Sequence, residues 1–544
     1  MKGKSFKPFS FSTDIDRARV LSLCVFSALV LLLGWQSDDS FHGYVMVKHL
    51  LEGNGFVYNI GERVCATTGP LYTLSCVLPC AVTGEIFFTT IVLDVIYSTL
   101  AYYIFAYKIC STREQVLTGF FAFTGSKAFM TYTTSGLENS LLFLFMGLFV
   151  WQYMKRDYFD GRQLLLLALT FSGLALTRMD NVLFFIPAIV YVYLFKRENT
   201  SFIKCVGIGL LGLLPFFIWE VFSFIYFGSF VPNTAYVKIG TGIALTDYIK
   251  HGILYYWYTL LNDVIVLVIP FVFIILTLIL HKAKYLLVSA GIVLYGLYLL
   301  SIGGDFMMGR HFTGMLYISV LAAVKMMNRE KDYFDTIRKM RAFFSTLVII
   351  CLIWSVTFCN TIGTQYLYGH IFASNISDER EFYSQTTGFF NNIRSLIRTG
   401  RTCWEDTWDD SGLDYIRREE FKGSIVDNAP GILVYTNSDI YLNDTYCLGD
   451  PLLSKLPAVY NPSWRVGHLK RVCPEEYRYS VEEDKNLISD PDLREYYDKI
   501  LLITRGDLFS TERLKAVMDL NTGKYDYLVE NYVSRHPETV RPEE

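Results

Sequence analysis

The sequence predicts a polytopic α-helical membrane protein that ends in a polar α+β domain outside the membrane. Three observations lead to this fold class. Hydrophobic residues make up 52% of the 544 residues, the mean hydropathy is +0.31, and apolar runs recur from residue 20 to about residue 361. A soluble multidomain enzyme has a more polar composition. The net charge of −3 gives no indication of nucleic-acid binding.

The first apolar run, residues 20–35, follows a basic N-terminal stretch. A signal peptide also begins this way, but no small-residue cleavage motif is evident and many apolar runs follow. We therefore expect a retained signal anchor with its N-terminus in the cytoplasm. Further spans are expected at residues 86–107, 116–130, 141–154, 164–177, 182–195, 202–227, 253–280, 286–302, 312–327 and 343–361.

A shorter run at residues 71–82, "LYTLSCVLPCAV", contains Pro79 and predicts a re-entrant or interfacial piece. If this run does not cross the bilayer, the basic clusters between later runs all face the cytoplasm, as does the basic block from Lys325 to Arg341. That arrangement agrees with the positive-inside rule. The sequence thus predicts about eleven spans in the plasma (inner) membrane, with the C-terminus outside.

The chain divides into a membrane module, residues 1–361, and a polar segment, residues 362–544, for which a small α+β domain is expected. In the polar segment "GILVYTN" and "KILLITRG" are typical of buried strands, whereas "EFYSQTTGFFNNIRSLIR" and "STERLKAVMDL" predict amphipathic helices. The spacing of Cys403, Cys447 and Cys473 leaves open whether two of them form a disulfide. No cysteine spacing typical of a metal site occurs.

The predicted topology places the unusual polar motifs together on the outer face. They are "DDSFHGYVMVKHLLEGNGF", "TYTTSGLEN", "TRMDN", "YFGSFVPNTAYVKIG" and "SIGGDFMMGRHF". Asp38 and Asp39 open the first motif, and ionised groups near hydrocarbon indicate function by default. A helix cap in the headgroup layer would also explain this doublet. The gathering of polar motifs on one face favours a single outward-facing site.

An amphipathic helix in the membrane interface is expected directly after the doublet. Its apolar face is formed by Phe41, Tyr44, Val47 and Leu51, and its polar side carries Lys48 and His49. The doublet, this helix and the re-entrant run would enclose a pocket at lipid level. Such a pocket suits a substrate with one apolar end and one polar end.

Residues 38–72, "DDSFHGYVMVKHLLEGNGFVYNIGERVCATTGPLY", resemble the first outer loop of GT-C glycosyltransferases, especially the terminal arabinofuranosyltransferase family of mycobacterial and corynebacterial cell walls. The motifs "TTSGLENSLLF", "LALTRMDNVLF", "YFGSFVPNTAYVK", "GGDFMMGRHF" and "CLGDPLLSKLPAVYNPSWRVGHLKR" follow in the same order. The resemblance covers about residues 20–475. One departure is Arg178-Met179-Asp180, where members often carry Arg-Pro-Glu, and it leaves the role of Asp180 open.

The resemblance implies an inverting GT-C glycosyltransferase whose donor is a polyprenyl-phosphate sugar, for example a pentofuranose such as arabinofuranose. The acceptor would be a hydroxyl of a cell-envelope glycan or glycolipid on the outer face. Such enzymes use no nucleotide sugar there, in agreement with the lack of a Gly-rich phosphate loop in the sequence.

This reaction needs a general base and a set of cations. A hydroxyl is a weak nucleophile, so Asp38 is expected to act as the base, with Asp39 orienting the acceptor or an ion. The two carboxylates are also candidate ligands for a divalent cation, Mg, Mn or Ca, although none is certain. The leaving phosphate requires fixed positive charge. The candidates that bind it are Arg310, His311, Lys238 and Arg178.

Further polar residues are candidates for substrate binding. They are Lys48, His49, Glu138, Asp180, Asn233, Asp305, Trp464, Arg465 and His468. Structural roles compete with this assignment: an acid at a helix N-terminus for Glu138, a bridge from Asp305 to Arg310, and packing of the outer domain for the segment at Trp464.

Two other functions are compatible with parts of the sequence. A transporter or flippase of lipid-linked sugars would place charges near the membrane midplane and show inverted repeats, whereas this chain keeps its charges at the outer boundary. A non-catalytic scaffold has no use for a doubled aspartate beside an interfacial helix. The glycosyltransferase is therefore the favoured function.

Overall fold

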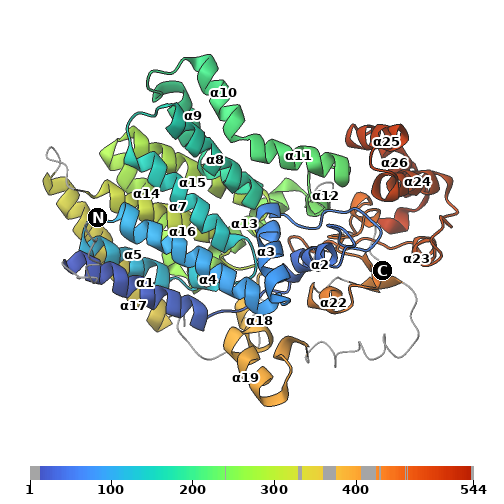
Figure 1. Ribbon diagram of the computed structural model, residues 1–544, viewed down its shortest axis with the longest axis horizontal. Coiled ribbons are helices and arrows are strands. Elements are labelled where there is room, and N and C mark those ends of the chain that lie inside the picture. The colour runs from blue at the N-terminus through green and yellow to red at the C-terminus, as the bar shows by residue number, and fades with distance from the viewer. Residues whose placement is uncertain are drawn as a thin grey trace, which may run out of the picture.

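The structure is a computed structural model that describes residues 13–238, 241–328, 334–358, 375–405, 424–427, 431–459, 461 and 464–540. A bundle of long helices forms most of the molecule, and the C-terminal helices gather at one end of it (Figure 1). Every apolar run predicted as a span is mainly helical over its described residues. The bundle contains α1 (Asp14–Leu32), α4 (Phe87–Tyr103), which continues as a π-helix η1 (Ile104–Ile109), α5 (Arg113–Gly125), α6 (Lys127–Thr131), α7 (Asn139–Lys155), α8 (Gly161–Thr177), the 3₁₀-helix η2 (Met179–Phe184), α9 (Ile186–Phe195), α10 (Phe202–Gly212), α11 (Leu214–Tyr226), α13 (Leu245–Asn262), α14 (Val264–Leu280), α15 (Ala283–Ser301), α16 (Phe312–Met326) and α17 (Phe334–Phe358).

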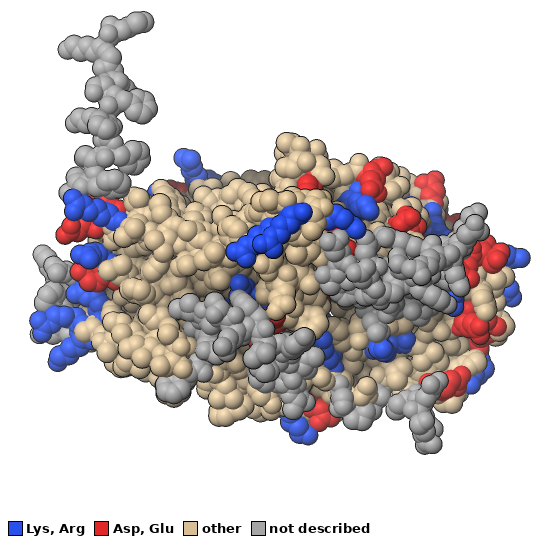
Figure 2. All heavy atoms as spheres, turned by 90° about the horizontal axis from the view of Figure 1, so that it is seen from below, with Lys and Arg blue, Asp and Glu red and all other residues tan. Residues whose placement is uncertain are grey.

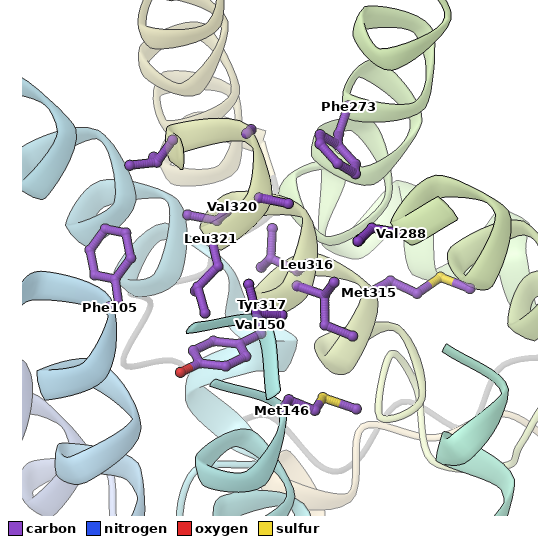
Figure 3. Close-up of a cluster of buried hydrophobic side chains, with 14 of the residues drawn as sticks. Phe105, Met146, Val150, Phe273, Val288, Met315, Leu316, Tyr317, Val320 and Leu321 are labelled. Carbon is purple, nitrogen blue, oxygen red and sulfur yellow. The ribbon is translucent and has the colours of Figure 1, made fainter. Parts of the chain in front are cut away.

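Helix α16 is the centre of the bundle. From Phe312 to Val324 every residue is buried, because the helix is apolar on all sides and neighbouring helices cover it. It packs against α14 and α7, and Figure 3 shows its residues Leu316 and Leu321 among side chains from several surrounding helices. This rigid core fixes the loop that precedes α16, which carries part of the site.

Three helical segments are long and apolar enough to cross a membrane: Phe87–Ile109, Ala283–Ser301 and Thr336–Thr357. Two bent pairs, α10 with α11 and α13 with α14, raise this number to five if each pair is one span. These numbers refer to the described residues. Charged side chains gather toward both ends of the long axis on the face shown in Figure 2, with a mainly uncharged surface between them. The helices are those of a membrane protein, and the number of about eleven spans stays a prediction.

Helices α2 (Ser40–Leu51) and α3 (Pro70–Thr83) lie at the end of the bundle that faces the C-terminal segment (Figure 1). The helix predicted after the doublet is confirmed as α2, and its apolar residues Phe41, Tyr44 and Val47 are buried, although Leu51 is exposed. Its placement in the membrane interface stays a prediction. Helix α3 corresponds to the short run with Pro79 and has 14 residues, fewer than the about 20 that a span needs.

The C-terminal segment is more helical than predicted. The strands predicted for "GILVYTN" and "KILLITRG" are wrong, because these residues lie in the helices α22 (Gly431–Thr436) and α24 (Pro491–Arg505). Short apolar runs do not distinguish a buried strand from the apolar face of a helix. Helix α24 begins much earlier than the run, at Pro491, where the side chain of Asp490 accepts the N–H groups of residues 492 and 493.

The two predicted amphipathic regions are helical. The first forms α18 (Glu379–Thr387) and α19 (Phe389–Thr399), and the second forms α25 (Thr511–Asn521). A single pair of parallel strands, β1 (Ser424–Asp427) and β2 (Tyr441–Asp444), is the sheet of the described residues. The remaining elements are α12 (Asn233–Lys238), η4 (Leu453–Lys455), α23 (Glu475–Glu482), α26 (Asp526–Arg535) and η5 (Pro537–Thr539).

The three cysteines of the polar segment, Cys403, Cys447 and Cys473, are free thiols. The predicted domain boundary at residues 361 and 362 lies outside the described residues. Within the described part, the C-terminal segment contacts the bundle through α12 and α2: η4 packs against α12, and α22 packs against α2.

Candidate active site

A cavity of about 430 Å³ lies where the bundle end meets the C-terminal segment. Its walls come from α2, α3, α12 and α18, from the loops that precede α7 and α16, and from residues 446–468. Most of the predicted site residues line it, although they are scattered along the chain. They are Asp38, Asp39, Glu138, Arg178, Lys238, Asp305, Arg310, His311, Arg465 and His468.

Asp38 anchors the C-terminal segment to the bundle. Its two carboxylate oxygens accept the backbone N–H groups of Gly431 at 2.7 Å and of Ile432 at 3.0 Å, at the start of α22. A Cβ atom at Gly431 would lie 2.1 Å from the carbonyl oxygen of Asp38, so only glycine permits this approach. Burial raises the pKa of Asp38 to about 7, although both N–H groups lower it.

Asp39 has a different environment. Its carboxylate lines the cavity and makes no hydrogen bond or ion pair with any described residue. Burial raises the pKa of Asp39, while the positive charges of His468 and Arg310 oppose that increase. Asp39 is therefore the member of the doublet that is available to a substrate.

Glu138 forms ion pairs with two arginines at the cavity wall opposite the Asp38-Asp39 doublet. Its Oε1 atom accepts Arg178 Nη1 at 2.7 Å and Arg310 Nη2 at 3.0 Å. Burial opposes ionisation of Glu138, but Arg310 and Arg178 outweigh it and hold its pKa at about 2. The carboxylate is thus ionised at neutral pH and holds two guanidinium groups at one place.

The loop that carries Glu138 is fixed by Asp94 of α4. The carboxylate of Asp94 accepts the Tyr72 hydroxyl at 3.0 Å, the Gly136 N–H at 3.0 Å and the Ser140 hydroxyl at 2.5 Å. Gly136 has φ +73°, and a Cβ there would collide with Gln36 and Tyr44. The glycine of "SGLEN" is therefore required by this turn.

Asp305 and His311 complete this wall. His311 Nε2 lies 3.2 Å from Asp305 Oδ2 and 3.3 Å from Arg178 Nη2, and its Nδ1 lies 2.8 Å from the Tyr295 hydroxyl. Arg310 Nη1 lies 3.9 Å from the same Asp305 oxygen. The expected pairing of Asp305 with Arg310 is therefore present, with His311 closer to the carboxylate.

Lys238, the last residue of α12, adds a further cation. It lines the cavity, is exposed, and has no ion-pair partner among the described residues. Asn233 positions α12: its Nδ2 donates to the carbonyl oxygens of Cys447 at 2.8 Å and Asp450 at 2.9 Å, and its Oδ1 accepts the Ser454 hydroxyl at 2.9 Å. Asn233 is thus a positioning residue rather than part of the cavity wall.

Four other predicted residues also lie outside the cavity wall. Asp180 accepts Arg178 Nε at 2.9 Å and supports it from behind. His49 is fully buried between the carbonyl oxygens of Val57 and Ser438. Lys48 donates to the carbonyl oxygen of Tyr435. The predicted polar side of α2 is thus covered by the C-terminal segment.

Trp464 is the fourth. Its ring packs on the rings of His251 and Tyr248, with centroids 4.9 and 5.0 Å away. This contact fits the structural alternative, packing of the C-terminal segment on the bundle, better than binding of a glycan.

The sequence did not indicate Glu379 and Tyr383 of α18, which line the cavity as well. Glu379 Oε1 accepts Arg465 Nη2 at 2.9 Å and the Ser377 hydroxyl at 2.6 Å, and the Arg465 guanidinium lies 4.1 Å from the centre of the Phe306 ring. The acidic pair Asp378-Glu379, which follows the last apolar run, is the sequence feature that could have indicated that this segment lines the cavity.

The doublet does not form a complete set of ligands for a divalent cation. Both Asp38 oxygens accept backbone N–H groups, and the described residues include no group of three His, Cys, Asp or Glu side chains arranged to hold a metal ion. The role of Asp38 and Asp39 as candidate ligands of a divalent cation stays a prediction.

Comparison with known proteins agrees with the motifs. No protein-family model matches the chain. Among curated proteins, the chain is similar to the terminal β-(1→2)-arabinofuranosyltransferase of Mycobacterium tuberculosis, with 27% identity over 420 residues. The match covers 66% of this chain and 65% of the relative, so about a third of each lies outside it. The resemblance to the terminal arabinofuranosyltransferase family is confirmed.

Proposed function

We propose that the chain is an integral-membrane glycosyltransferase of the GT-C type. It moves a sugar, a pentofuranose such as arabinofuranose, from a polyprenyl-phosphate donor to a hydroxyl of a cell-envelope glycan or glycolipid. The reaction takes place at the outer face of the plasma membrane, with inversion at the anomeric carbon. The relative supports the glycosyltransferase activity, and the arrangement of charges supports the donor class.

One observation carries the proposal: the cavity pairs an unpartnered carboxylate with a group of cations. Asp39 has no polar partner among the described residues, and Arg178, Arg310 and Lys238 line the same space. Transfer of a sugar from a phosphate donor needs both features. The acceptor hydroxyl must lose its proton to a base, and the leaving phosphate gains negative charge that cations stabilise.

The general base in this proposal is Asp39, whereas the sequence alone favoured Asp38. The oxygens of Asp38 are already bound by Gly431 and Ile432, so its role is to hold the wall. Asp39 removes the proton of the acceptor hydroxyl as the oxygen attacks the anomeric carbon. The bond between that carbon and the phosphate oxygen breaks, and the electron pair leaves with the polyprenyl phosphate.

The cations stabilise this leaving group. The donor is a phosphodiester with one negative charge, and the departing phosphate monoester acquires a second. Arg178 and Arg310, held by Glu138, present fixed positive charge that needs no reorganisation during the reaction. Lys238 makes no direct ion pair among the described residues, although the charges of Asp305 and Asp180 act on it, so its ammonium group is available to the leaving phosphate.

The test compares wild type with Asp39→Asn in membranes supplied with a panel of labelled polyprenyl-phosphate sugars. Transfer to glycan that is lost in the variant at equal protein level supports the proposal. Undiminished transfer by Asp39→Asn would remove Asp39 from the mechanism. Movement of label between leaflets without a new glycosidic bond would instead identify the alternative, a flippase.

A further inference from the structure

Helix α19 presents apolar side chains on the surface of the molecule. Phe390, Leu396 and Ile397 are 38%, 44% and 80% exposed. At 100° per residue these side chains, with Phe389 and Ile393, fall in an arc of about 120°. We call this arc the α19 stripe. An exposed apolar stripe on a short helix needs a covering partner.

Two basic residues lie on one side of the stripe. Arg394 and Arg398 are exposed, and neither has an ion-pair partner among the described residues. Helix α19 contains no Asp or Glu. A helix with an apolar arc and arginines beside it is typical of one that lies in the headgroup region of a bilayer with anionic lipids.

Helix α19 lies beside the exposed apolar surface at the end of α1. It lies at the lower edge of the bundle in Figure 1, on the side seen in Figure 2, next to the end of α1. The Phe389 N–H donates to the carbonyl oxygen of Gly34 at 2.8 Å, and the Phe389 ring packs on Phe88 at 5.7 Å between centroids. Leu32, in the last turn of α1, is itself 61% exposed.

We propose that α19 is an in-plane membrane anchor: the α19 stripe inserts into the outer acyl-chain region, and Arg394 and Arg398 bind anionic lipid headgroups. The occupant of the stripe is therefore the bilayer, and the charge of the flanking residues selects phosphatidylglycerol-like lipids over zwitterionic ones.

This anchor has a direct connection to the cavity. Helix α18 precedes α19 through Gly388, and it carries Glu379 and Tyr383 into the cavity wall. The Thr387 hydroxyl donates to the Gln36 carbonyl oxygen at 2.6 Å, and the Gln36 N–H donates to Thr387 O at 3.3 Å. Residues 34–36 lead directly into the Asp38-Asp39 doublet. The bilayer would thus hold the cavity wall at headgroup depth.

The experiment uses the full chain in vesicles of phosphatidylcholine with or without phosphatidylglycerol. A fluorescent amino acid is placed at position 397, and bromine atoms on the upper acyl chains serve as quenchers. The control carries the probe at position 527, where Tyr527 of α26 is also solvent-exposed, at 51% against 80% for Ile397, but lies in the C-terminal group of helices. Thermal unfolding and size exclusion confirm that both proteins are folded.

We expect quenching at position 397 to exceed that at position 527 at least three-fold. Phosphatidylglycerol should increase it further, and the Arg394→Gln/Arg398→Gln variant should lose that increase. Equal quenching at both positions would overturn the proposal. A cross-link between two copies at position 397 without quenching would also overturn it and assign the stripe to a second chain. These readouts do not depend on glycosyl transfer.

Discussion

Asp38 and Asp39 are adjacent in sequence, but their carboxylates have different partners. The Asp38 oxygens accept two backbone N–H groups of α22, from Gly431 at 2.7 Å and Ile432 at 3.0 Å, whereas the Asp39 carboxylate faces the cavity without a polar partner among the described residues. Position in the sequence could not separate the two. The contacts separate a residue that joins two parts of the molecule from one that is free to react.

Substitution of Asp38 should therefore affect mainly stability, and substitution of Asp39 should affect mainly catalysis. Asp38→Ala leaves two buried N–H groups without an acceptor, so we expect it to lower the free energy of unfolding by about 1–3 kcal/mol. Asp39→Ala removes no hydrogen bond and should change stability by less than about 0.5 kcal/mol, yet abolish transfer. Thermal unfolding in detergent and the initial rate of transfer measure the two effects. Loss of stability in Asp39→Ala alone would reverse the assignment.

The pH dependence of transfer follows from the raised pKa of Asp39. Because a base must be ionised, the rate should fall as the pH decreases through a value above the ordinary 3.8 of an aspartate. The Arg465 charge lowers the pKa of Asp39, so Arg465→Gln should raise that pKa and move the acidic limb of kcat to higher pH.

The control for this shift is Arg478→Gln, because Arg478 lies on α23 and pairs with Glu482 rather than with the cavity. Its acidic limb should coincide with that of wild type. A limb that moves to lower pH in Arg465→Gln would contradict Asp39 as the titrating base.

The helical runs and most of the cavity wall could be predicted from the sequence. Long apolar runs predict helices because their length and composition are compatible with few other structures. Polar motifs at the ends of those runs come together at one end of the bundle because neighbouring helices are antiparallel. Residues such as Glu138 and Arg310, which are separated by 172 positions, were found in this way.

The remainder depends on tertiary contacts that no local pattern contains. His49 has the spacing of a polar-face residue, but the carbonyl oxygen of Ser438 covers it from a distant part of the chain. Glu379 enters the cavity because residues 380–389 pack on the end of α1. The run "GILVYTN" is helical partly because Asp38, almost 400 residues earlier, supplies acceptors for its first N–H groups.

Glu138 should be required for stability as well as for activity. Glu138→Gln leaves Arg178 and Arg310 close together without the carboxylate that they share, and we expect a loss of about 3–5 kcal/mol in unfolding free energy at pH 7. The surface pair Asp157 and Lys284 provides the control, since Asp157 is 86% exposed and Asp157→Asn should cost less than about 1 kcal/mol. Equal midpoints of thermal unfolding for the two variants would show that the arginines do not depend on Glu138.

Lys238 should act on the transition state more than on donor binding. The leaving phosphate gains a second negative charge only as the glycosidic bond breaks, and Lys238 is the cavity cation without an ion-pair partner among the described residues. Lys238→Gln is therefore expected to lower kcat about ten-fold, or about 1.4 kcal/mol, with a smaller change in the donor KM. Lys250→Gln is the matched control, because Lys250 is 75% exposed and pairs with Asp247. An increase in donor KM at constant kcat would place Lys238 in ground-state binding of the phosphate instead.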